Sequence, residues 1–464
     1  MASASLFAQS LPFPRSGDSH FAYTSGTLKP AGGQAKLDAA VVEFYEVWRT
    51  AFLQRITHAD VPSIEEGKEQ AFVNANAHDP DADPKIKFRS VSEGQGYGML
   101  IAALMAGHPR AAGVPADREK RDFDALYRFF KAHPSVPDPE DHPEVKHTNL
   151  MAWQVQGASL KKLIGQKPND DSDSASDGDM DIAYALLLAE KQWGNAGEIN
   201  YGAAAAAVIS EIEAHDVNPL AFTIKLGDAI TPEYENAKER AENKYFATRT
   251  SDFTPQHWRA FAKVGKAELW QKVITKTLAI EASVYQRFAP KTGLMPDFLQ
   301  LPPGPADAGL YHPPTGFFQE DEENNGDGNW SYNACRTPWR LATDYLLTGE
   351  SSAVAQLQAL NAWASHTTGM HPERLNAGYA LSGDKLSVKE KGKIHYESAG
   401  SCFIAPLAVS AMLPGDQAWL DALWENLTPS PNLVNEPYFE STVKLLCMIT
   451  VSGNWWDPKG VKGE

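Results

Sequence analysis

A polar helix start leads directly into an apolar helix body at Ala175-Ser176-Asp177-Gly178-Asp179-Met180-Asp181-Ile182-Ala183-Tyr184-Ala185-Leu186-Leu187-Leu188-Ala189. Ser176, with Asp179 three residues later, is typical of a capping box, although Asp stands where Glu or Gln is usual. The residues after Asp181 are almost all apolar, which predicts a buried helix rather than a surface helix.

The three carboxylates of this stretch, Asp177, Asp179 and Asp181, are compatible with several roles. They can cap the helix and complement its dipole, or they can point into a ligand-binding cleft. Calcium binding is a further alternative, but the run departs from the EF-hand loop, because Ala175 replaces a ligand and no Glu follows at the twelfth position. The local sequence leaves these roles open.

Helical periodicity extends over the rest of the chain. From Leu37, apolar residues recur at spacings of four and three up to Phe52, which places them on one helix face. Comparable stretches lie at 97–106, 120–131, 181–193, 202–213, 257–263, 267–286, 338–348, 353–365, 404–412 and 440–450. Few runs alternate with period two, and we find neither a sequence repeat nor a long linker. The pattern predicts an all-α fold of packed helical hairpins, with residues 1–464 in a single domain.

Composition restricts the possible partners. The 464 residues include 59 Asp and Glu against 42 Lys and Arg, a net charge of −17. This charge repels nucleic acids and anionic membranes, and it leaves neutral or cationic ligands open. The three cysteines, Cys335, Cys402 and Cys447, lack the spacing of a metal site. Residues 1–15 lack the features of a signal peptide, so the chain is either cytoplasmic or already without its signal.

A second junction between a loop and an apolar helix, after the one at 175–189, places one carboxylate among glycines at Ser92-Glu93-Gly94-Gln95-Gly96-Tyr97-Gly98-Met99. Glycines permit the close approach of a ligand, and the pKa of a lone Glu at a helix start depends on its surroundings. The alternative is a first-turn Glu that only complements the helix dipole.

A third junction joins an acidic loop to an aromatic segment. Phe317-Phe318-Gln319-Glu320-Asp321-Glu322-Glu323 leads on to Trp330-Ser331-Tyr332-Asn333-Ala334-Cys335-Arg336-Thr337-Pro338-Trp339-Arg340. Aromatic faces with polar groups beside them stack on sugar rings. Core packing of the aromatic residues, with an Arg paired to an acid, is the alternative.

Together these junctions resemble glycoside hydrolase family 8, which comprises inverting endo-glycanases and chitosanases. Residues 92–99 resemble the family's S-E-x-Q-G-Y-G-M segment, residues 175–193 resemble its A-S-D-G-D-x-D-I-A signature, and residues 332–340 resemble Y-N-A-C-R-x-P-W-R. Shorter matches lie at 149–153, 251–257, 294–298 and 452–456, so the resemblance spans about residues 10–457. It implies an (α/α)6 barrel and a glycoside hydrolase that needs no cofactor or metal.

The resemblance makes Glu93 the general acid. Many family members have an Asp as the base where this sequence has Asn333, and Asn cannot accept a proton at neutral pH. This departure resembles the branch of chitosanases and β-glucanases, in which a Glu on the preceding loop is the base. Aligning Phe318 selects Glu320, which we prefer, whereas counting back from Asn333 selects Glu323.

Further roles follow from the same resemblance. Asp177 is expected to hold the distorted sugar, while Asp179 and Asp181 are expected to be structural. Asn333 is expected to position the attacking water, and Arg336 to hold a Glu or the substrate. The other candidate substrate-binding residues are the aromatic Trp153, Trp330, Tyr332 and Trp339, together with Tyr97 and Asp252.

The expected substrate is a β-1,4-linked polysaccharide. Chitosan is favoured because a polycation is attracted to a chain of net charge −17, and endo-β-1,4-glucanase or lichenase activity is the alternative. Inversion requires the two carboxyl groups to lie roughly 6.5–9.5 Å apart, on different helices or loops. We also expect a secreted monomer. A non-catalytic carbohydrate-binding barrel would lack Glu93 or the loop carboxylates. An epimerase or lyase would need clustered bases, which His147 and His257 do not provide.

Overall fold

The computed structural model describes residues 11–233, 243–301, 309–314, 327–390, 393–428 and 436–460. Within these ranges the chain is mainly helical, as predicted. No helix there is long and apolar enough to cross a membrane.

Six helices of the described residues form a closed inner ring. Each contacts the next in sequence order, and the last contacts the first. They are α2 (Ser92–Leu104), α5 (Ser176–Trp193), α8 (Pro255–Phe261), α10 (Thr337–Thr348), α12 (Ser401–Ser410) and α14 (Tyr438–Val451). Every residue of α12 is buried, as expected for a helix that is covered on all sides.

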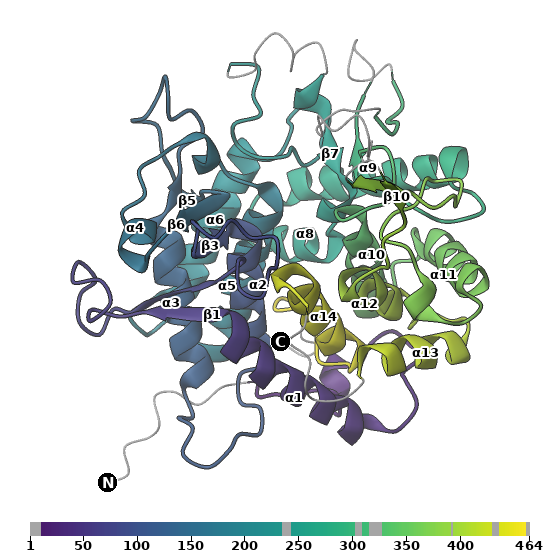
Figure 1. Ribbon diagram of the computed structural model, residues 1–464, viewed down its shortest axis with the longest axis horizontal. Helices are drawn as coiled ribbons and strands as arrows, with labels where there is room; N and C mark the ends of the chain where they lie inside the picture. The colour runs from purple at the N-terminus through teal and green to yellow at the C-terminus, as the bar shows by residue number, and fades with distance from the viewer. Residues whose placement is uncertain are drawn as a thin grey trace.

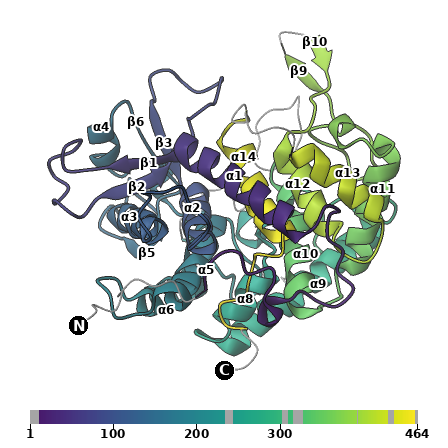
Figure 2. The ribbon, with the colours of Figure 1, turned by 90° about the horizontal axis from the view of Figure 1, so that it is seen from below.

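A second set of helices packs outside this ring. In ring order from α2, they are α3 (Arg118–Ala132), α6 (Tyr201–His215), α9 (Ala267–Phe288), α11 (Val354–Thr368), α13 (Gln417–Leu427) and α1 (Gln34–Phe52). Each contacts its inner partner, so α1 pairs with α14 and joins the two ends of the chain (Figures 1 and 2). The outer helix α1 is amphipathic and buries Leu37, Val41, Phe44, Trp48 and Phe52. The arrangement is an (α/α)6 barrel, as the family resemblance implied.

The strands are short and lie in segments that lead from an outer helix to the next inner helix. In the described residues they form five two-stranded antiparallel sheets. The pairs are β1–β2 (Leu53–Ile56, Gln70–Val73), β3–β6 (Phe88–Val91, Gln154–Gly157), β4–β5 (Pro134–Ser135, His147–Met151), β7–β8 (Thr248–Arg249, Phe298–Leu299) and β9–β10 (Val388–Glu390, Lys393–His395). The short helix α4 (Leu160–Ile164) lies in one such segment. The barrel end at which the inner helices begin is therefore the elaborated one.

The N-terminal segment covers the opposite end. The backbone amides of Phe13, Thr24 and Leu28 donate to the carbonyls of Ala106, Leu346 and Met412, each at 2.8 Å. Two of these carbonyls follow the last residues of α2 and α12, and Leu346 lies in the last turn of α10. Carbonyls at helix ends have no partner within their own helix, so the segment satisfies them and closes this end of the barrel.

Two local predictions were wrong. The helix α5 begins at Ser176 itself with Ala175 as its N-cap, and the Ser176 hydroxyl donates to the carbonyl of Lys225 at 2.8 Å. The glycines serve helix packing rather than ligand approach. A Cβ on Gly178 would lie 2.4 Å from Ser92 Oγ, and one on Gly96 would lie 2.8 Å from Asp181 Cβ. Glycine at these positions lets α2 and α5 approach closely.

Candidate active site

The predicted acid, Glu93, lies in the first turn of α2, at the elaborated end of the barrel. Every other residue of α2 is buried, whereas the Glu93 side chain is 16% exposed. The Tyr438 hydroxyl, at the start of α14, donates to Glu93 Oε1 at 2.7 Å. Arg336 Nη1, just before α10, donates to Glu93 Oε2. Two residues at the starts of other inner helices therefore fix this carboxyl group.

The surroundings of Glu93 favour its protonated form. Burial raises the pKa of Glu93, the Arg336 charge opposes this, and the charge of Asp177 adds to it, so that the pKa lies above its usual value. A general acid needs such a raised pKa to keep its proton near neutral pH.

The surroundings of the neighbouring Asp177, at the start of α5, favour its ionised form. Its Oδ2 accepts from Arg336 Nη1 at 3.0 Å, and its Oδ1 accepts from Arg249 Nη2 at 3.3 Å and from the Gly178 amide at 2.9 Å. Burial alone would raise the pKa of Asp177, but the two guanidinium groups outweigh it and lower the pKa to about 2. A carboxyl group of raised pKa and a carboxyl group of lowered pKa thus share one arginine.

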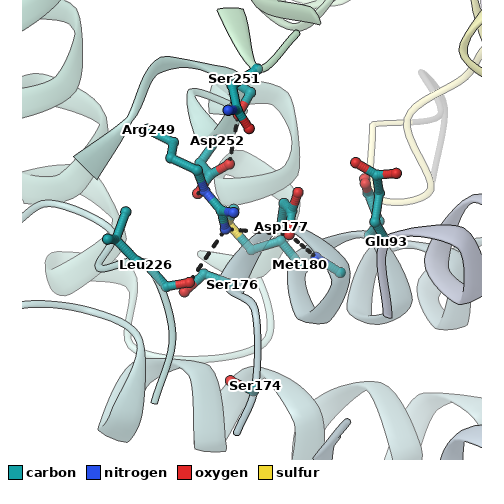
Figure 3. Close-up of polar contacts among 12 residues, drawn as sticks. Glu93, Ser174, Ser176, Asp177, Met180, Leu226, Arg249, Ser251 and Asp252 are labelled. Atoms are coloured by element: carbon teal, nitrogen blue, oxygen red, sulfur yellow. Dashed lines mark hydrogen bonds and ion pairs between the residues drawn. The ribbon is translucent and has the colours of Figure 1, made fainter. Parts of the chain in front are cut away.

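Arg249, at the end of β7, is fixed by Asp252 (Figure 3). Arg249 Nε donates to Asp252 Oδ2 at 3.0 Å, and the Ser251 hydroxyl donates to Asp252 Oδ1 at 3.0 Å. The Asp252 carboxyl is buried, which raises its pKa. Its neighbours make Asp252 a support for Arg249 rather than the direct substrate contact that we predicted.

The turn before α10 places Asn333 beside Arg336. Arg336 Nη2 donates to Asn333 Oδ1 at 3.1 Å and to Ser251 Oγ at 3.2 Å. Asp297 anchors this turn by accepting from the amides of Ser331 and Ala334, at 3.0 and 2.7 Å. Burial raises the pKa of Asp297 to about 7, although these amide bonds oppose the change.

Three predicted substrate contacts belong to the core instead. Trp330 packs against Phe403, and Trp339 packs against Tyr97. The three predicted residues, Trp330, Trp339 and Tyr97, are all buried. A ring without exposed surface cannot stack on a sugar, so Trp330 and Trp339 are withdrawn as stacking residues. Tyr97 instead accepts from Arg336 Nη1 at 3.2 Å and helps to orient it.

Tyr332 and Trp153 retain accessible surface. Tyr332 is 43% exposed and makes an edge contact with Phe403. Trp153 is half-buried, and its carbonyl accepts from the Ser92 amide at 2.9 Å, next to Glu93. Both rings remain candidates for stacking on a sugar.

The other two aspartates of α5 have structural partners. Asp179 Oδ1 accepts from the Met151 amide at 3.1 Å. Asp181 forms a buried two-point ion pair with Arg340, at 2.9 and 2.6 Å, and contacts His257 Nε2 at 2.9 Å. These carboxylates thus hold β5 and α10, and they do not gather with Asp177 around a common point. Within the described ranges, no cluster of His, Cys, Asp and Glu has the spacing to hold a metal.

Both candidate bases, Glu320 and Glu323, lie outside the described residues. Two partners within the site were missed by sequence reasoning. Tyr438 lies 345 positions from Glu93, and nothing in its local sequence marks it. Arg249 lies three residues before Asp252, a spacing that suggests an ion pair but not its contact with Asp177.

The fold and the site together define a class of protein. A carboxyl group of raised pKa beside one of lowered pKa, at the elaborated end of a helical barrel, is an arrangement suited to glycosidic bond cleavage. This arrangement is that of a glycoside hydrolase.

Comparisons with known proteins identify the family. The model of glycosyl hydrolases family 8 matches residues 80–450. A beta-glucanase of Niallia circulans is 37% identical over 98% of this chain and 93% of its own length. An endoglucanase of Bacillus sp. strain KSM-330 is 31% identical over 94% of this chain and 80% of its own. The solved structure of a beta-1,3-1,4-glucanase from Paenibacillus sp. X4 is 36% identical, has a TM-score of 0.77, and covers 97% of this chain and 100% of its own. The chain belongs to glycosyl hydrolases family 8.

Proposed function

We propose that the protein is an inverting endo-glycanase that cleaves β-linked glucan, with Glu93 as its general acid. The observation that carries this proposal is the state of Glu93: an accessible carboxyl of raised pKa, held by Tyr438 and Arg336, at the end of a family 8 barrel. Relatives named beta-glucanase and endoglucanase support the substrate class.

In this mechanism Glu93 donates its proton to the oxygen that leaves with the departing sugar. Asp177 keeps its negative charge because its pKa is about 2. Unlike Asp252, it keeps a small exposed part of its side chain, so we assign to it a hydrogen bond from the sugar and the stabilisation of the positive charge that develops on the ring. Arg336 contacts both carboxyl groups, so it keeps them in a fixed relation before the substrate binds.

The base must be a second carboxylate, because Asn333 cannot accept a proton. We propose Glu320 for this role, with Glu323 as the alternative. Asn333 then serves to orient the attacking water. Its side-chain oxygen accepts from Arg336 Nη2, which leaves the amide nitrogen to donate to the water.

Three observations bear on the substrate class, and they do not all favour the same one. The expected preference for chitosan receives no support from the relatives, whose names refer to glucans. Among the described residues of the site, Arg249 and Arg336 pair with Asp177 and Asp252, and this balance agrees with a neutral substrate. Chitosan remains the second candidate, since the net charge of −17 would attract a polycation over longer distances.

Release of reducing ends from barley β-glucan, carboxymethyl-cellulose, xylan and chitosan tests the proposal. We expect glucan cleavage to dominate, with Glu93→Gln lowering the rate by about 10²–10⁴-fold while the protein stays folded. Chitosan cleavage that exceeds glucan cleavage and weakens with salt would support the second candidate. Proton NMR of the first product tests inversion, because the new reducing end must appear as the α-anomer.

Two further properties are part of the proposal. A polymer substrate does not enter cells, so we propose that the protein acts outside the cell. We also propose that it is a monomer, because the inner ring closes within one chain. Sedimentation velocity at several concentrations tests the second property.

A further inference from the structure

Exposed apolar side chains gather at one end of the barrel. Within the described residues, five large apolar side chains are exposed: Leu220, Leu310, Tyr332, Ile394 and Tyr396. Each lies in a segment that joins an outer helix to the next inner helix, at the same end as Glu93. Single exposed apolar residues scattered over a surface are ordinary. Their restriction to the end that carries the site indicates a binding surface.

The hairpin β9–β10 presents two of these residues together. Ile394, in β10, and Tyr396, just after it, are 71% and 62% exposed. Residues two apart in an extended chain share one face. His395 and Glu397 alternate with them and pair with each other at 3.8 Å. The extended segment therefore has one apolar face and one polar face.

Backbone pairing connects this hairpin to the active site. The Ala377 amide donates to the carbonyl of Glu397 at 2.8 Å, and Trp330 exchanges two backbone hydrogen bonds with Tyr379, both at 2.9 Å. Residues 376–379 thus join the base of the hairpin to the segment that carries Tyr332 and Asn333. The hairpin stands out from the barrel beyond this point (Figure 2).

We propose that Tyr332, Ile394 and Tyr396 form a track that binds a β-linked glucan chain beyond the sugar units held at Glu93. The inference rests on the proposed function and extends it to the polymer. The faces of glucose rings carry axial C–H groups, so aromatic and aliphatic side chains remove them from water without needing a charged partner. The track gives the enzyme higher affinity for long chains than for short ones.

Kinetics on long and short substrates test the track. Tyr396→Ala should lower the ratio of kcat/KM for barley β-glucan to kcat/KM for cellohexaose by about threefold to tenfold, the loss expected for one stacked ring. His395→Ala is the matched control, because it alters the polar face of the same segment, and it should leave the ratio unchanged. An unchanged ratio in Tyr396→Ala would overturn the inference.

Direct binding separates this inference from the proposed function. Glu93→Gln protein should be retarded in a native gel that contains barley β-glucan, and adding Tyr396→Ala should reduce the retardation. Tyr396-dependent retardation without any cleavage by the unsubstituted protein would support the track and contradict the proposed function. Glucan cleavage without such retardation would overturn the track alone. A dimer in sedimentation velocity that Tyr396→Ala dissociates would also overturn it, because the apolar face would then bind a second copy.

Discussion

Replacement of Glu281 by Gln should make the stability of the protein less dependent on pH. Glu281 lies on α9 and is buried, and neither of its carboxylate oxygens has a hydrogen-bond partner among the residues that the structure describes. Burial raises the pKa of Glu281 from 4.5 to about 8. The folded protein therefore keeps this carboxyl group neutral at pH values where the unfolded chain has released the proton.

The direction and size of this pH dependence follow from the linkage between folding and proton binding at Glu281. Below pH 4.5 the carboxyl group is protonated in both states, so the stability that it contributes is fully present. Between pH 4.5 and about 8 only the unfolded state ionises, and the free energy of unfolding falls by about 1.4 kcal/mol per pH unit. The total loss is up to about 5 kcal/mol, and it is complete above the folded pKa.

Urea denaturation of both proteins at several pH values between 4.5 and 8.5 measures the difference. The free energy of unfolding of Glu281→Gln, relative to the unsubstituted protein, should rise steadily over this range. Glu268→Gln, on the exposed first turn of the same helix, is the control and should show no such trend. A Glu281→Gln difference that is equal at pH 5 and pH 8 would refute the neutral, buried state.

Three further predictions concern the active site and its support. One of Glu320→Gln and Glu323→Gln should lower kcat by about 10²–10⁴-fold while the other stays near the unsubstituted rate; equal, mild losses would exclude both residues as the base. Tyr438→Phe should move the alkaline limb of the pH–activity profile to higher pH. The Tyr438 hydrogen bond stabilises the ionised form of Glu93 and lowers its pKa, so its loss raises that pKa. A limb that stays in place or moves to lower pH would contradict this. Gly178→Ala should lower the free energy of unfolding by about 1–3 kcal/mol, because its Cβ would lie 2.4 Å from a side-chain oxygen of α2; thermal denaturation measures the loss, and an unchanged Tm would contradict the close packing.

The helices could be predicted because their signal is local. Apolar spacing from Leu37 to Phe52 corresponds to α1, and the apolar run after Asp181 corresponds to the body of α5. The prediction that Ser176 caps α5 was wrong, because its hydroxyl donates to the distant carbonyl of Lys225 rather than bonding to its own helix. A capping pattern considers only the backbone of the helix that begins there, whereas backbone groups from distant parts of the chain compete for the same hydroxyl group.

The site could be predicted only where a motif carried it. Glu93, Asp177 and Arg336 lie together, as the family resemblance led us to expect. The aromatic residues were harder, because Trp339 and Tyr332 have similar sequence surroundings and opposite exposure. Burial depends on which helices close over a ring, and that information is distributed along the whole chain. Tyr438 shows the same limit, since its contact with Glu93 depends on closure of the inner ring.

The pairing of α1 with α14 has a consequence for synthesis on the ribosome. The last residue of α1 is Phe52 and the first of α14 is Tyr438, so 386 positions separate them. At a synthesis rate of about 5–20 residues per second, α1 waits roughly 20–80 seconds until α14 has been made. During this time the apolar face that includes Trp48 has no inner helix to cover it. The barrel therefore cannot close before α14 has been made, and the nascent chain is exposed to aggregation until α14 leaves the ribosome.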